Sequence, residues 1–146
     1  MSWTFYNSSG EALVQNAESE ATQAEVEAET AGVKFVPPDL LRHHPGVSKC
    51  WAINSADGAT VLASYNLSSL TDGGTGNRTY VFDDDFSSVN WSAVGSPGNP
   101  AGNDTQALIF GQNVRTAAST DCLVRSSGSA GLNIDAINFV AFFGDQ

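Results

Sequence analysis

The chain has few positive charges and no long apolar run. Of its 146 residues only six are Lys or Arg, against 16 Asp or Glu, which gives a net charge of −10 at pH 7. This balance disfavours binding to nucleic acid and to anionic membrane surfaces, because both carry negative charge. No apolar segment approaches the roughly 20 residues that span a bilayer, so we expect no membrane insertion.

Cysteine and histidine are also scarce, which limits the chemistry that the chain can support. The two cysteines, Cys50 and Cys122, are too few for a disulfide framework. The first six residues have neither a basic region nor an apolar region, which predicts that no secretory signal is present. We therefore expect a reducing cytoplasm and free thiols. The two histidines, His43 and His44, are not accompanied by a nucleophile elbow or a phosphate-binding loop, so we predict no enzymatic activity and no cofactor.

The acidic residues divide the chain into two parts. All six glutamates precede residue 30, whereas nine of the ten aspartates follow residue 46. Glu together with Ala favours helix, and Asp favours the turns between strands. We place the boundary near Gly46, with an N-terminal segment over residues 1–45 and a β-domain over residues 46–146.

The N-terminal segment contains a hairpin signal and a helix signal. Trp3–Tyr6 and residues 11–15 flank Asn7-Ser8-Ser9-Gly10, which predicts a short hairpin. Thr22 to Glu25 form a capping box that opens a helix expected to end at Gly32. An isolated hairpin is marginal in water. Its aromatic residues are therefore predicted to dock on another protein: Trp3, Phe5 and Tyr6.

The second part alternates short apolar runs with Gly-, Asn- and Ser-rich turns. This pattern predicts a mainly β protein with a β-sandwich of about seven strands, preceded by the hairpin and a short helix. The expected strands cover residues 47–54, 59–67, 78–83, 89–95, 105–113, 121–127 and 135–143.

The last of these segments is apolar on both faces of the predicted strand. A strand of this kind must be covered twice, and in a domain of about 100 residues the second cover is most economically another subunit. We predict a homo-oligomer whose interface contains Ile137, Phe139, Val140 and Phe142. The alternative is that the N-terminal segment folds back over this strand.

The polar connections are the candidates for recognition, because loops held on a rigid sandwich commonly bind partners. Those at residues 71–77, 83–88, 96–104 and 128–133 suit hydrogen bonding to sugar hydroxyls or to a polar protein surface. The candidate receptor-binding residues are Asn77, Asp83, Asp84, Asp85, Asn99, Asn103, Asp104 and Asn133. Simple solvated connections are an equally good interpretation of any one loop.

Two clusters resemble metal ligands only in part. His43 and His44 could meet near a trimer axis, and Asp83 and Asp85 could share a cation because alternate side chains of an extended segment point the same way. The acidic run lacks the spaced loop of a calcium site. A helix end for the histidines and a solvated strand end for the aspartates explain both clusters better, so we predict no metal site.

Several segments, taken in order, resemble bacteriophage and prophage tail fibre proteins. The similar segments are Met1–Leu13, Ala21–Ala28, Val33–Pro38, His44–Val47, Lys49–Trp51, Ala63–Gly76, Thr79–Phe82, Asn90–Ser96 and Asp135–Gly144. None of them is diagnostic alone, and Cys50 and the Asp83–Asp85 run depart from the family pattern. The resemblance implies a trimeric, mainly β virion protein, folded in the host cytoplasm and located on the tail or capsid surface, whose distal surface contacts the host.

Three functions remain open from the sequence. The first is a tail fibre or receptor-binding tip for host attachment. The second is a purely structural virion component, such as a capsid decoration or tail adaptor, without a host ligand. The third is a polysaccharide-degrading tail enzyme, which the absence of glutamate after residue 29 disfavours.

Overall fold

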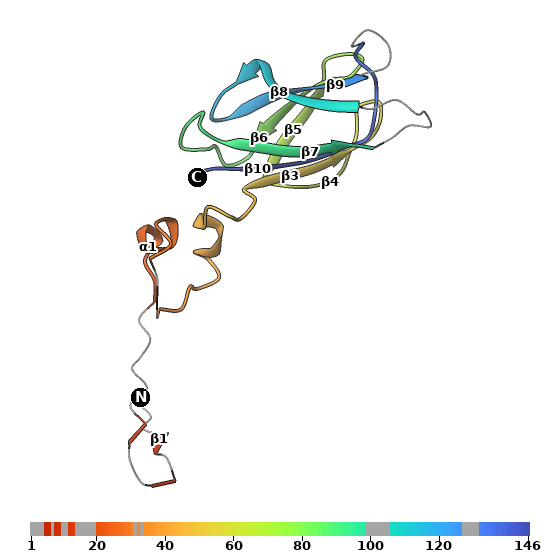
Figure 1. Cartoon of the computed structure of the whole chain (residues 1–146). Coiled ribbons are helices and arrows are strands. Elements are labelled where there is room, and N and C mark those ends of the chain that lie inside the picture. The colour runs from red at the N-terminus through yellow and green to blue at the C-terminus, as the bar shows by residue number, and fades with distance from the viewer. Residues whose placement is uncertain are drawn as a thin grey trace. The chain divides into compact units, whose positions relative to one another are not determined.

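The computed structural model divides the chain into two compact units, residues 1–44 and 45–146. It describes residues 5–6, 8–9, 12–13, 20–30, 32, 34–98, 106–126 and 132–146 (Figure 1). The division falls one residue before the boundary expected from the distribution of Glu and Asp. Each unit is described by itself.

The first unit contains the predicted hairpin and a capped helix. Strands β1 (Phe5–Tyr6) and β2 (Ala12–Leu13) pair in the antiparallel direction, and helices α1 (Gln23–Glu27) and η1 (Leu41–His43) follow. The capping box at Thr22 and Glu25 is confirmed, since each side chain accepts from the other residue's backbone N–H. The helix ends at Glu27 rather than Gly32, because Glu29 adopts a left-handed conformation with φ 55°.

The second unit consists of two antiparallel sheets of four strands each, so the mainly β class and the sandwich are confirmed. One sheet has the order β4-β3-β10-β7 and the other has the order β5-β6-β9-β8. The strands are β3 (Cys50–Asn54), β4 (Val61–Tyr65), β5 (Leu67–Asp72), β6 (Asn77–Phe82), β7 (Ser92–Pro97), β8 (Gln106–Arg115), β9 (Ser119–Ser126) and β10 (Asn138–Phe143).

The predicted strand over residues 59–67 is wrong in one respect, because the chain changes sheet at Asn66. This residue has φ 54°, a left-handed conformation that asparagine tolerates better than most side chains. Its side-chain amide donates to the carbonyls of Lys49 and Asp84, at 3.0 and 3.2 Å, and its Oδ1 accepts the Asp84 N–H at 2.7 Å. The corner separates β4 from β5 and brings the domain to eight strands.

Aromatic side chains from both sheets form the core between them. The ring of Phe142 lies at its centre, with ring centroids 5.1 Å from Phe82, 5.7 Å from Trp91 and 5.7 Å from Phe110. Tyr80 closes the cluster and donates its hydroxyl to Asn54 Oδ1 at 2.7 Å. The core therefore fills the space between the sheets of a single chain.

This packing corrects two of the residues that we assigned to the trimer interface. Val140 and Phe142 are 5% and 0% exposed within one chain, because β10 turns them toward the opposite sheet. Another subunit cannot reach either side chain. Ile137 and Phe139 alternate to the other side and keep 37% and 46% of their surface exposed.

Both cysteines are free and fully buried, and their ionisation gives a pH-dependent prediction. Burial raises the pKa of the Cys50 and Cys122 thiols from about 9 to about 12. The unfolded chain therefore releases these protons at lower pH than the fold does. The contribution of the thiols to stability is constant below about pH 9 and should fall from pH 9 to pH 12, by about 1.4 kcal/mol per pH unit for each thiol.

Urea unfolding at pH 8, 9.5 and 10.5 measures this slope. Burial also raises the pKa of Tyr80, which adds to the loss above pH 10. A Cys122→Ala variant should lose the contribution of one thiol and keep the other. A free energy of unfolding that does not change up to pH 11 would contradict the burial of the thiols.

Candidate interaction surfaces

The strand registers define two ends of the β-domain. At one end lie Asn54, Pro97 and Asn138, because Asn138 pairs with both of the other residues. Gly98 N–H donates to the Ile137 carbonyl there at 2.5 Å. We call this the far end. The opposite end holds the segment that leads into β3, since Lys49 N–H donates to the Phe142 carbonyl at 2.8 Å. We call it the linker end.

A buried arginine connects three segments at the far end. Arg78 lies on strand β6, and its side chain is fully buried between the sheets. Its Nη2 donates to the carbonyls of Ala56 and Ala136, the latter at 3.1 Å, and lies 4.0 Å from Asp135 Oδ1. Ala56 belongs to the β3–β4 connection and Ala136 to the segment before β10. One side chain thus fixes two connections that are 80 residues apart in sequence (56 and 136).

Two glycines complete the far end because no other residue fits their positions. Gly58 has φ +72°, and a Cβ there would lie 2.6 Å from Arg78 Nε. Gly76 has φ +68° and lies against the backbone of Ile134. Its N–H donates to Asp135 Oδ1 at 2.8 Å, and its carbonyl accepts the Val124 N–H at 2.8 Å. The β5–β6 turn is therefore tied to the segment before β10.

The structure separates the predicted receptor-binding residues into two groups. Asn77 and Asn133 lie at the far end, where Asn133 is exposed and Asn77 is half-buried. Asp83, Asp84 and Asp85 are exposed at the linker end, where the Asp84 backbone contacts Asn66 and the Gln146 side chain. The eight candidates therefore do not form one surface. Three of them lie outside the described residues: Asn99, Asn103 and Asp104.

The two strand ends that flank these three residues in sequence both lie at the far end. The chain leaves β7 at Pro97, which pairs with Asn138, and enters β8 at Gln106, which pairs with Ser126. Ser126 N–H donates to the Leu132 carbonyl at 3.0 Å. Three of the four predicted recognition loops thus begin and end at the far end, and only the loop at residues 83–88 lies at the linker end.

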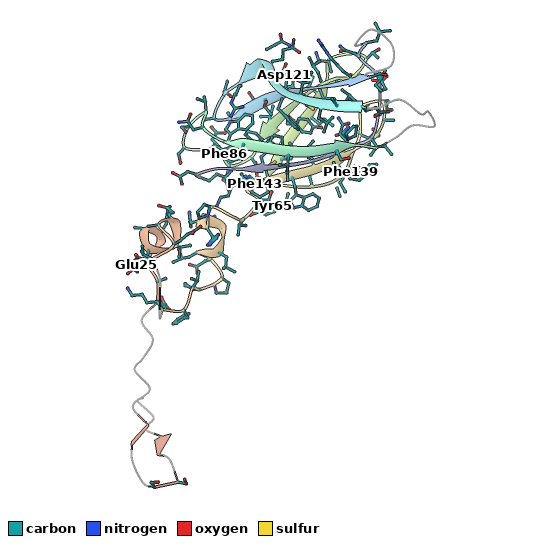
Figure 2. The ribbon with its side chains drawn as sticks, viewed as in Figure 1. Glu25, Tyr65, Phe86, Asp121, Phe139 and Phe143 are labelled. Carbon is teal, nitrogen blue, oxygen red and sulfur yellow. The ribbon has the colours of Figure 1, made fainter. Side chains whose placement is uncertain are left out.

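A second surface is the outer face of the β4-β3-β10-β7 sheet. The cross-strand registers place two rows of side chains on it. One row runs Tyr65, Trp51, Ala141, Val94, and the other runs Ala63, Ile53, Phe139, Ser96. We call these eight residues the outer face. Figure 2 labels Tyr65 and Phe139 on this sheet. Sequence reasoning assigned Phe139 to such a surface but missed Trp51, Tyr65 and Val94.

The N-terminal docking residues are described only in part. Trp3 lies outside the described residues, and Phe5 and Tyr6 are described as the backbone of β1. Their role in docking stays a prediction.

The histidines lie within the first unit, beside acidic side chains. His43 Nδ1 is 3.9 Å from Glu27 Oε1, and His44 Nε2 is 3.9 Å from Glu29 Oε1. In the same unit, the Lys34 ammonium donates to the Glu25 carboxylate. This hydrogen bond and the one from the Thr22 backbone N–H lower the pKa of Glu25 to about 2. Among the described residues, no group of three or more His, Cys, Asp or Glu side chains is arranged to hold a metal ion.

Thiols and carboxylates are groups that many enzymes use in catalysis, and this domain buries two thiols and the Asp121 carboxylate. Their surroundings show how each contributes to the packing or the hydrogen bonding of the fold. A thiol whose pKa is raised by burial is the reverse of an activated nucleophile. The buried Asp121 carboxylate, labelled in Figure 2, accepts from the backbone and side-chain nitrogens of Asn113 and from Val114 N–H. The distances are 3.0 and 2.9 Å to the two Asn113 nitrogens and 3.2 Å to Val114 N. The strand next to β9 therefore supplies the donors to this carboxylate.

Comparisons with known proteins identify no relative of this chain. No protein-family model, no curated protein and no solved structure matches the chain. In the part of the chain that the structure describes, no helix has the length and apolar content needed to cross a membrane.

Proposed function

We propose that this chain is a bacteriophage virion protein, a tail fibre or receptor-binding tip, that attaches the particle to a host surface through the far end of its β-domain. One observation carries the proposal: the described residues at which three of the four polar connections begin and end lie at the far end, opposite the segment that leads into β3. Recognition loops on a rigid sandwich commonly gather at one end in this way. The resemblance to tail fibre proteins supplies the virion context.

In this proposal the protein binds without catalysing a reaction and needs no cofactor. The far end presents side-chain amides and carboxylates, such as those of Asn133 and Asp135, which are exposed. These groups suit hydrogen bonding to a glycan or a polar protein surface. The first unit attaches the protein to another virion protein, and three copies form the working assembly.

The experiment is a pair of substitutions at opposite ends of the domain, made in the particle that carries this gene. Asn133→Ala changes the far end and Asp85→Ala changes the linker end, and both side chains are exposed. Each lost polar contact is worth about 1–3 kcal/mol, or about 5- to 150-fold in affinity. We expect the variant that combines Asn133→Ala, Asn99→Ala and Asp104→Ala to adsorb to host cells at least about 5-fold more slowly than the wild type, the lower end of that range.

Asp85→Ala particles should adsorb at the normal rate. Normal adsorption by the combined far-end variant, with the protein incorporated at wild-type amount, would remove the receptor-binding proposal. Deleting residues 1–17 should have the opposite effect, since it should abolish incorporation while the purified protein stays folded.

A purely structural virion component is the second candidate function, and the outer face favours it. An exposed apolar sheet face fits a protein partner better than it fits a polar glycan. If far-end variants adsorb normally while outer-face variants fail to assemble, this second function replaces the first.

A further inference from the structure

Buried polar atoms that lack a hydrogen-bond partner gather at the far end of the β-domain. Among the described residues of this domain, such atoms belong to Asn77, Arg78, Gln106 and Arg125. The first two residues begin β6, Gln106 begins β8, and Arg125 lies one residue before the end of β9. Folded proteins seldom bury polar atoms unpaired. A binding partner from outside the chain explains why the unpaired atoms occur at this end.

Arg125 differs from the other three cations of the β-domain. Lys49 and Arg78 are buried, and Arg115 donates to two backbone carbonyls. Arg125 is half-buried and makes no hydrogen bond or ion pair with any described residue. Its Nε is buried, whereas its two Nη nitrogens reach the surface. A guanidinium has five N–H donors and no acceptor, so this side chain presents unused donors together with a positive charge.

The strand registers place two amide side chains beside Arg125 on the solvent side of the β5-β6-β9-β8 sheet. Asn133 forms a bridge with Arg125, and Asn77 pairs with Leu123, two residues before Arg125 on β9. Residues that pair directly point to the same side of a sheet, as do residues two apart on one strand. This side is opposite to the core, because the alternate residue Cys122 is fully buried in the core. We call Arg125, Asn133 and Asn77 the arginine site.

The composition of the arginine site favours a carboxylate that belongs to a sugar. A guanidinium binds a carboxylate through two parallel hydrogen bonds. An amide side chain both donates and accepts, as a hydroxyl does, so the exposed amide of Asn133 suits a hydroxyl next to the carboxylate. A phosphate or a polyanion carries more negative charge. The site offers one cation, in a chain whose net charge is −10, which disfavours both.

We propose that the arginine site binds the carboxylate of an acidic sugar, with the Nη nitrogens of Arg125 on the carboxylate and the Asn133 amide on a neighbouring hydroxyl. This deepens the proposed function, on which it rests for the source of the sugar, a glycan of the host surface. Sequence reasoning selected Asn77 and Asn133 but missed the arginine beside them, because the bridge between Arg125 and Asn133 joins two separate segments.

The test is an NMR titration of the full chain with two sugars that differ in one group. Methyl glucuronide carries the carboxylate, and methyl glucuronamide has a neutral amide of similar shape in its place. At equal ionic strength, the acid is expected to shift the resonances of the Arg125 Nε–H and the Asn133 side-chain amide in a saturable way. The amide and glucose 6-phosphate are each expected to bind at least tenfold more weakly than the acid.

Arg125→Gln and Arg42→Gln are a matched pair of variants. Each removes one positive charge, and Arg42 is an exposed residue of the first unit. Arg125→Gln should weaken binding of methyl glucuronide at least tenfold, whereas Arg42→Gln should leave it unchanged. If Arg125→Gln fails to fold, Asn133→Ala changes an exposed side chain and should weaken binding by about fivefold, the loss of one polar contact.

Equal binding of the acid and its amide, or binding of glucose 6-phosphate as tight as that of the acid, would overturn the proposal. So would the absence of a saturable shift with methyl glucuronide, methyl galacturonide and N-acetylneuraminic acid at about 20 mM, well above a dissociation constant of about 1 mM. None of these measurements uses a host. If the sugars fail to bind while far-end variants adsorb slowly, receptor binding stands and the acidic sugar is rejected. If the acid binds while far-end variants adsorb normally, the arginine site stands and the host function is rejected.

Discussion

Replacing Phe142 by alanine is expected to destabilise the β-domain by about 3–5 kcal/mol, the range for deletion of a fully buried aromatic ring. Phe142 is 0% exposed, and its ring lies 5.1–5.8 Å from those of Tyr80, Phe82, Trp91 and Phe110. These neighbours come from the opposite sheet and from the loop before β7, and all of them are held by the surrounding packing, so they can move only a little way into the cavity that the substitution leaves. Domains of this size are stable by about 5–15 kcal/mol, so the substitution removes a large share of the free energy of unfolding.

Phe139→Ala is the matched control, because Phe139 lies on the same strand and faces the opposite side. It is 46% exposed, so its truncation should cost about 1–1.5 kcal/mol, half the transfer free energy of a fully buried ring. Urea unfolding of both variants, followed by tryptophan fluorescence, measures the two losses. A Phe142→Ala loss no larger than that of Phe139→Ala would contradict the assignment of the core to the inner face of β10.

Replacing Arg78 by alanine is expected to cost about 3–5 kcal/mol and to loosen the far end. The substitution leaves the carbonyls of Ala56 and Ala136 without their shared donor, at about 1–3 kcal/mol for each buried acceptor. It also removes the side chain against which Gly58 packs. Nε and Nη1 of Arg78 have no hydrogen-bond partner among the described residues, so only the bonds of Nη2 oppose the desolvation of the charge.

Arg78→Lys is the control for charge without the planar fork. A lysine ammonium can reach one carbonyl but cannot reproduce the shape of the guanidinium, so an intermediate loss of stability is expected. Hydrogen exchange should show faster exchange of the Gly58 and Gly76 amides in both variants, and unchanged exchange of Phe86 at the linker end. Uniformly faster exchange over the whole domain would mean that Arg78 supports the fold in general and not the far end.

The sandwich could be predicted because its signals are local. Short runs of alternating apolar residues separated by Gly, Asn and Asp mark strands and turns in any β protein. The capping box from Thr22 to Glu25 is equally local, and its position was predicted correctly. What such signals cannot give is the sheet to which each strand belongs.

The corner at Asn66 shows why. Apolar alternation continues through it from Tyr65 to Leu67, so the sequence reads as one strand while the chain passes from one sheet to the other. Only the left-handed conformation of Asn66 breaks the strand, and asparagine is too common in this chain to mark that position.

The importance of Arg78 was missed although a signal existed. Arg78 lies in phase with Tyr80 and Phe82 at period two, which places it on the inner face of β6. An arginine side chain in a predicted strand is usually placed on the solvent-exposed face. For this reason the period-two pattern did not lead us to place Arg78 in the core. The gathering of three loops at the far end could not be predicted at all, because it depends on pairings between strands that are far apart in sequence, such as β3 with β10.

Competition for adsorption tests the central claim most directly. Host cells are incubated with the purified full-length protein, and the adsorption rate of the particle that carries its gene is then measured. The account predicts that the wild-type protein slows adsorption in a saturable way, and that protein with Asn133→Ala, Asn99→Ala and Asp104→Ala does not. Adsorption at the normal rate in the presence of a saturating excess of folded wild-type protein would contradict the claim that the far end binds the host.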